Sequence, residues 1–199
     1  MTDATDAIDD IHDFWFGDIE ADGLPSAEQG QLWFIKKPET DRLITARYAE
    51  LLAQAAAGEL DHWAETDRGL IALVIVLDQF SRNIHRDSPA AFAADHRALA
   101  LALGAINAGR DRAMPLIHRV FLYLPLEHAE DLALQERCVE LFEALVAEND
   151  SERVRDFASY AHSHRDVIAR FGRFPHRNKL LGRPTTAEEE AYLDEHGGF

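Results

Sequence analysis

The longest uninterrupted apolar run of the sequence is LIALVIVL, residues 70–77. A run of this length is typical of either a buried helix or a buried strand. We expect a helix, because no second segment of similar character exists for a strand to pair with, and a lone strand leaves its backbone groups without partners. Thr66 stands where the N-cap of such a helix is needed. The run therefore predicts an all-helical (all-α) fold.

Helix signals continue along the rest of the chain, where capping residues, prolines and glycines separate segments with apolar residues at helical spacing. The expected helices are a short one with Ile8, Ile11 and Trp15 that ends at Gly17; one opened by a capping box of Ser26 and Gln29; one from Pro38 to Gly58; the one after Thr66; one opened by Ser88 and Pro89 that ends at Gly109; one from Pro115 that Pro125 interrupts or restarts; one with Leu134, Cys138, Leu141 and Leu145; one from Arg155 to Phe171 that ends at Gly172; and a terminal one opened by Thr186 and Glu189 that ends near Gly197.

The turns between these segments are short, which favours antiparallel neighbours. We expect a single domain, residues 1–199, of about eight to ten helices packed as antiparallel helical hairpins. No sheet of three or more strands is expected.

Charge and composition exclude several kinds of partner. The formal net charge of -16 opposes binding to the phosphate backbone of nucleic acid. Cys138 is the only cysteine, so nothing requires an oxidising compartment. No apolar run approaches the ~20 residues that span a bilayer, and residues 1–10 are acidic, unlike a secretory signal. We expect a cytoplasmic protein without a membrane or nucleic-acid partner.

A first polar cluster follows directly after the apolar run and consists of Asp78, Gln79, Arg82 and Asn83. On a continuous helix, Asp78 and Arg82 share one face, as do Gln79 and Asn83. Buried charges need partners, so this cluster is either an ion pair that ties helices together or the polar wall of a pocket.

A second cluster is Glu127 and His128 with Glu130 and Asp131. A carboxylate beside an imidazole suits general acid–base chemistry, although acids at this position also cap a helix. The spacing does not match a known metal site, so we expect no metal and no cofactor.

The third cluster lies in a basic segment and comprises Arg173, His176, Arg177 and Asn178, with His162, His164 and Arg165 preceding it. Arginine forks suit carboxylate and phosphate groups, which is compatible with an anion site. The alternative is that Arg165, Arg173 and Arg177 neutralise the buried acids Asp78, Glu127 or Asp131.

Two further features favour the protein core over a site. Aromatic pairs such as Trp15 with Phe16 and Trp33 with Phe34 are more often core than pocket lining, and Cys138 falls on an apolar stripe.

Several short motifs together resemble one known family. They are Phe14-Trp15-Phe16-Gly17, Trp33-Phe34 with Lys37, Asp78-Gln79-Phe80 with Arg82-Asn83, Pro125-Leu126-Glu127-His128 with Glu130-Asp131, and Gly172-Arg173-Phe174-Pro175-His176-Arg177-Asn178. From about Phe14 to Gly182 the chain resembles the uncharacterised bacterial domain-of-unknown-function family 924. The resemblance implies an all-helical, tetratricopeptide-like fold and no established activity. Ser81 departs from it, since the family pattern has proline there, and serine permits the helix to continue.

Two functions fit these clusters. The first is a helical binding module whose site, lined by the three clusters, takes an acidic peptide or a small anionic ligand. The second is a small hydrolase-like enzyme acting on an anionic substrate, with His128 or His176 as general base and Arg173 and Arg177 stabilising charge. A structural protein without a small-molecule site is a third alternative. The binding reading predicts that Asp78, Arg82, Glu127, His128 and the Arg173–Asn178 group converge in space.

Overall fold

The computed structural model describes residues 4–198, apart from the side chain of Phe34. Within these residues the backbone forms helices and turns, and the sole β-type pairing is a single bridge between Ile19 and Pro25. The all-helical prediction is confirmed. Contacts divide the chain into two compact units, a first unit of Met1–Arg86 with Ala90–Pro125 and a second unit of Asp87–Pro89 with Leu126–Phe199. The tetratricopeptide-like arrangement and the single domain stay predictions.

The helices of the first unit follow the predicted segments closely. They are α1 (Ala4–Trp15), α2 (Ala27–Phe34), α3 (Pro38–Ala57), α4 (Asp67–Val74), α5 (Ser81–Ile84), α6 (Asp95–Asn107) and α7 (Leu116–Glu127), of which α7 passes into the second unit at Leu126. Short helical turns join them at Asp61–Glu65, Pro89–Phe92 and Arg110–Ala113.

The apolar run 70–77 is helical and buried throughout. Thr66 caps α4 by accepting a hydrogen bond from the backbone of Gly69. The helix then widens into a π-helical turn, Ile75–Phe80, and continues directly into α5. Ser81 permits this continuation, and its hydroxyl hydrogen-bonds to the carbonyl oxygens of Asp78 and Ala91. Asp78 lies within this π-helical turn.

Aromatic side chains fill the core of the first unit. The Trp15 ring packs edge-on against Phe80 and Phe121, with centroid separations of 5.3 and 5.7 Å. Trp15 and Phe16 are almost completely buried, so the core interpretation is correct for this pair. Trp33 donates its indole N–H to the carbonyl of Trp15. The Phe34 side chain lies outside the described residues.

Two predicted helix boundaries and one predicted capping box differ from the structure. Ser88 and Pro89 do not open the long helix, because Pro89–Phe92 forms a short 3-10 turn and α6 begins at Asp95. The carbonyl of Ala91 is taken by the Ser81 hydroxyl, which accounts for the interruption. Pro125 does not break its helix, since α7 continues through it to Glu127.

The third difference concerns Gln29. Ser26 caps α2 as predicted, by accepting from the Gln29 backbone. The Gln29 side chain donates instead to the carbonyl oxygens of Phe14 and Trp15 at the end of α1. This residue therefore ties two helices together rather than completing a capping box.

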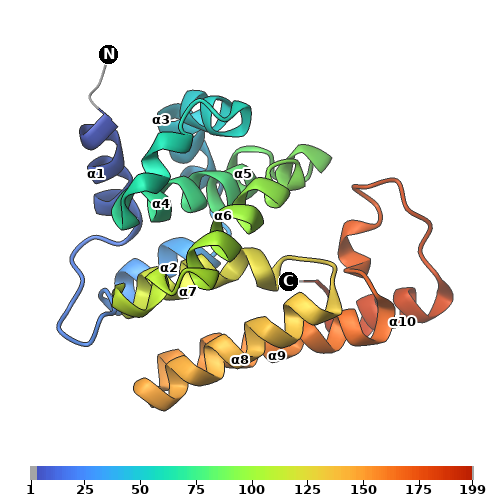
Figure 1. Ribbon diagram of the computed structural model, residues 1–199. Helices are drawn as coiled ribbons and strands as arrows, with labels where there is room; N and C mark the ends of the chain where they lie inside the picture. The colour runs from blue at the N-terminus through green and yellow to red at the C-terminus, as the bar shows by residue number, and fades with distance from the viewer. Residues whose placement is uncertain (1–3, 199) are drawn as a thin grey trace. The chain divides into compact units, whose positions relative to one another are not determined.

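The second unit is built on a long antiparallel hairpin. Helices α8 (Leu132–Glu148) and α9 (Glu152–Phe171) run along each other and are joined by residues 149–151 (Figure 1). Asp131 caps α8, and Gly172 ends α9 in the left-handed conformation. A short turn, η5 (Pro175–Arg177), and α10 (Ala187–His196) follow, and Thr186 and Glu189 form the predicted capping box of α10.

The buried stripe of α8 consists of Gln135, Cys138, Val139, Phe142 and Leu145, so Leu134 and Leu141 lie beside it rather than on it. Cys138 is buried and burial raises the pKa of its thiol, as expected for an inert core residue. Among the described residues no helix is both long and apolar enough to cross a bilayer.

Candidate functional site

The first polar cluster forms an ion-pair network inside the first unit. The Arg82 guanidinium donates both terminal nitrogens to the Asp95 carboxylate at 2.9 Å and lies 3.2 Å from Asp78 Oδ1. Gln79 donates to the other Asp78 oxygen. Burial opposes the Arg82 charge, but Asp78 and Asp95 outweigh it and raise the pKa of Arg82. This cluster ties the π-turn to the start of α6.

Asn83 belongs to a neighbouring set around Asp41 of α3. It donates to Asp41 Oδ1 at 2.9 Å, and Arg86 pairs with the same carboxylate. These partners overcome desolvation and lower the pKa of Asp41. The contacts favour the helix-tying alternative for Asp78, Gln79, Arg82 and Asn83.

Glu127 and His164 form a buried pair in the second unit. Glu127 ends α7, His164 lies on α9, and His164 Nδ1 is 3.2 Å from Glu127 Oε1 and 2.9 Å from the carbonyl oxygen of Tyr160. Both neighbours are acceptors, so Nδ1 carries the proton and Nε2 carries the lone pair. Burial, His128 and Arg177 lower the pKa of His164 to about 3.

Arg177 lies at the centre of the neighbouring polar groups. Its guanidinium carbon is 4.4 Å from the centroid of the Phe174 ring, and Nη1 donates to the His128 carbonyl at 3.0 Å. The His164 and His176 rings flank Phe174 at centroid distances of 5.5 and 5.7 Å. We call His128, His164, His176 and Arg177, with Glu127, the histidine–arginine cluster.

The charges of this cluster act on one another. Burial is the main cause that lowers the pKa of His176 to about 4, and Arg177 and His128 lower it further. The ring centroids of His128 and His164 are 6.3 Å apart. Arg177 and His164 are more than nine-tenths buried, whereas His128 and His176 are partly exposed. Solvent therefore reaches the cluster along His128 and His176.

Arg173 and Asn178 belong to a separate network. Arg173 binds both oxygens of Glu189 at 2.6 and 2.9 Å, and the buried Asn178 amide donates to Glu189 Oε2 at 3.3 Å. The hydrogen bond from Arg173 is the main cause that lowers the pKa of Glu189 to about 2. These contacts tie α10 to the segment after α9, so they favour a structural role.

Glu130 and Arg183 complete this support. Glu130 accepts the Phe174 backbone N–H at 2.8 Å and a two-pronged ion pair from Arg183 at 2.6 and 2.9 Å. Arg183 also donates to the Phe174 carbonyl and to Asn178 Oδ1. Phe174, and with it the Arg177 guanidinium, is thereby fixed in place.

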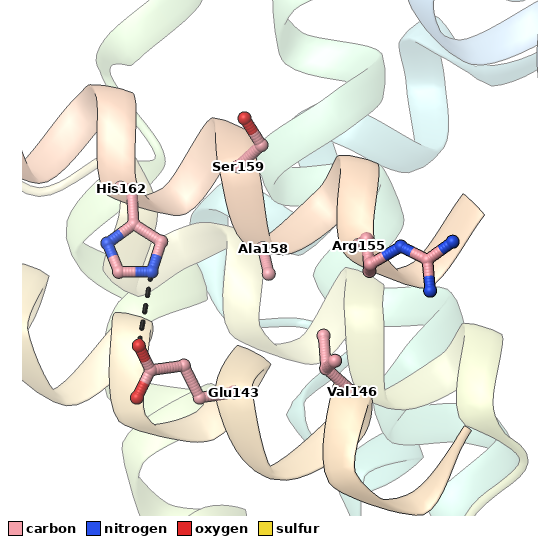
Figure 2. A pocket seen from close by; sticks show the side chains of 6 residues that line it. All are labelled: Glu143, Val146, Arg155, Ala158, Ser159 and His162. Carbon is pink, nitrogen blue, oxygen red and sulfur yellow. Dashed lines mark ion pairs between the residues drawn. The ribbon is translucent and has the colours of Figure 1, made fainter. Parts of the chain in front are cut away.

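The remaining members of the third cluster point elsewhere. Arg165 pairs with Asp166, and His162 pairs with Glu143 at 3.2 Å. His162 lines a shallow hollow of about 400 Å³, together with Glu143, Val146, Arg155, Ala158 and Ser159. Figure 2 shows these side chains, which come from α8 and α9. His162 is the only member of the three predicted clusters among the residues that line this hollow.

The structure places Glu127, His128, His176 and Arg177 near one another and adds His164, which the sequence prediction omitted from the site. That these residues form a binding site stays a prediction. His164 was visible as a histidine on the apolar stripe of its helix, and a buried stripe histidine needs a partner. Glu189 was identified from the sequence only as the capping-box partner of Thr186, and Arg183 carried no signal that separates it from the other basic residues of its segment. That the Asp78 set converges with the second-unit set stays a prediction.

Comparisons with known proteins agree with this description. Residues 11–197 match the family model described as bacterial protein of unknown function (DUF924), and the chain belongs to this family. A solved structure of the protein of unknown function ATU0120 from Agrobacterium tumefaciens shares 38% identity and a TM-score of 0.83, over 97% of this chain and 99% of that one. No curated protein matches the chain.

Proposed function

We propose that the protein is a binding module and that the histidine–arginine cluster binds a small anion, namely a phosphate or carboxylate group carried by a small ligand or an acidic peptide. The observation that carries the proposal is the buried Arg177 guanidinium, held over the Phe174 ring among three histidine rings. Such a group is preorganised, because its position is fixed before a ligand arrives.

Electrostatics support an anion as the occupant. Arginine stays charged at all relevant pH values, and the nearby imidazoles are held neutral by burial and by that charge. An arriving anion stabilises the protonated imidazoles, so it gains donors as it binds. Because the protein as a whole carries a charge of -16, a local cationic site gives selectivity rather than general attraction to anions.

The proposal assigns different roles to the predicted site residues. His128, His176 and Arg177 contact the ligand, together with His164, and Glu127 orients His164. Arg173 and Asn178 support the segment that carries Arg177, through Glu189. Asp78, Gln79, Arg82 and Asn83 hold helices of the first unit together.

One observation favours a hydrolase as the second candidate. The Glu127–His164 pair fixes the Nδ1–H tautomer and leaves the lone pair on Nε2, as in a general base oriented by a carboxylate. In that role Nε2 takes a proton from water, the water oxygen bonds to the acyl or phosphoryl centre, and the leaving group departs with the electrons of the broken bond.

Thermal unfolding with added anions tests the proposal. Inorganic phosphate, citrate and an oligo-glutamate peptide are each added at constant ionic strength, and at least one should raise the Tm of the wild type. Arg177→Gln should abolish that increase, while Arg155→Gln, at an exposed arginine of α9, should retain it. A wild type that no anion stabilises would contradict binding. Turnover of p-nitrophenyl esters or phosphates that His164→Gln removes would favour the hydrolase.

A further inference from the structure

Two buried histidines that do not belong to the histidine–arginine cluster meet in the first unit. His12 of α1 is 3% exposed and His118 of α7 is 7% exposed, and their ring centroids are 5.0 Å apart. His12 Nε2 lies 2.9 Å from the carbonyl oxygen of Arg68 on α4. Three helices are therefore joined at one point by two imidazoles.

The hydrogen bonds of this pair are incomplete. A carbonyl oxygen only accepts, so His12 Nε2 carries the hydrogen and Nδ1 carries the lone pair. Within the described part of the chain, His12 Nδ1 and His118 Nε2 are buried and have no hydrogen-bond partner. The Phe16 ring lies against both imidazoles, at centroid distances of 5.5 and 4.7 Å. A proton added to either ring would enter an apolar space without an acceptor.

The surrounding charges do not compensate for such a proton. Arg68 acts on both rings and disfavours their charged forms. Asp9 and Asp13, both on α1, favour the charged form of His12, but Asp9 already pairs with Arg68 Nε at 2.7 Å. Burial is the main cause that lowers the pKa of His12 to about 4 and that of His118 to about 3.

We propose that His12 and His118 form an acid-sensitive lock that holds α1 on the rest of the first unit. Protonation of the two rings places two charges beside Arg68 in a space without acceptors, and α1 detaches to let water reach them. Detachment exposes Trp15 at the end of α1 and Phe16, which follows it.

The direction of the effect follows from proton linkage. In the detached state both imidazoles regain a pKa near 6.5, which is above their values in the closed state. Detachment therefore takes up protons below about pH 6.5, and it becomes more favourable as the pH falls toward 4. Above pH 7 the lock is closed.

Hydrogen exchange measured by mass spectrometry on the full chain tests the lock. Peptides from α1 are compared with peptides from α9 between pH 6.5 and 4.5, after correction for the intrinsic exchange rate. The double variant His12→Gln, His118→Phe keeps a donor for the Arg68 carbonyl and an aromatic ring in place of His118. His62→Gln, at an exposed histidine of the first unit, serves as the control.

In the wild type and the control, the opening constant of α1 should rise on the order of 1,000-fold more between pH 6.5 and 4.5 than in the double variant, because close to two protons are taken up over this range. An opening constant of α1 that changes equally with pH in the wild type and the double variant would overturn the lock. Exchange of α1 and α9 peptides in one common opening step would also overturn it. Should the double variant not fold, His118→Phe alone should lower the rise about tenfold per pH unit. Titration of either wild-type ring near pH 6.5 in the closed protein, followed by NMR, would also overturn it.

Discussion

The Glu127 carboxylate lies 3.2 Å from Nδ1 of His164, and both side chains are buried. Together with the Tyr160 carbonyl, it presents two acceptors to this nitrogen. We therefore expect His164 to be neutral at pH 7, in the tautomer with hydrogen on Nδ1. Nitrogen-15 NMR of the imidazole rings distinguishes the two tautomers, and a signal typical of hydrogen on Nε2 would show that the pair is arranged differently.

The close packing at the start of α4 predicts the effect of a single methyl group. A Cβ at Gly69 would overlap the carbonyl oxygen of Trp63 and crowd the Thr66 hydroxyl that caps the helix. Gly69→Ala should lower the free energy of unfolding by roughly 2 to 4 kcal/mol, through strain and loss of the cap. Urea denaturation measures this change.

Gly104 of α6 provides the matched control, because a Cβ there meets nothing within 4 Å. Gly104→Ala should be neutral or should stabilise the protein by about 0.5 to 1 kcal/mol, since alanine is the better helix former. Equal losses for the two variants would mean that α4 tolerates the added methyl group no worse than α6 does.

Acid should weaken the second unit through His164. Its pKa is about 3 in the folded protein and about 6.5 when unfolded, so the unfolded state binds the proton first. The stability that neutral His164 gives to the folded state is complete above pH 6.5 and is lost as the pH falls toward 3. Between pH 7.5 and 5 the wild type should lose about 2 kcal/mol relative to His164→Gln. A pH-independent difference between the two proteins, measured by urea denaturation, would contradict the buried neutral state.

Chelation should leave the protein folded. The sequence has one thiol and no closed set of metal-ligand spacings. The Tm should therefore be the same with and without excess EDTA. A fall of many degrees after chelation, reversed by one added divalent metal, would reveal a structural metal site.

The helical fold could be predicted because local signals decide it. Thr66, Pro38, Gly58, Gly172 and the Thr186–Glu189 box act within one turn of their helix ends, and each occurs where it was expected. The errors arose where a distant partner intervenes. Ser81 takes a carbonyl that would have continued the Pro89 turn into α6, and Gln29 donates to α1 instead of capping α2.

The candidate site was predictable only in part, for the same reason. Polar sequence motifs contain His128, His176 and Arg177, and these motifs predict them as site residues. The partners of Arg173 and Glu130 lie 16 and 53 residues away along the chain, at Glu189 and Arg183. Such pairings depend on tertiary packing, since the local sequence identifies Glu189 as the capping-box partner of Thr186 but does not show that it binds Arg173.

Anion binding at the histidine–arginine cluster is tested most directly by NMR of the histidine rings. Phosphate, or another anion that raises the Tm, is titrated into the protein at constant pH and ionic strength. The ring signals of His128, His164 and His176 should shift together with one saturating Kd, and Arg177→Gln should remove the shifts, while those of His12, His118 and the exposed His62 remain unchanged. Saturation that moves only exposed histidines, or shifts that persist in Arg177→Gln, would contradict the account.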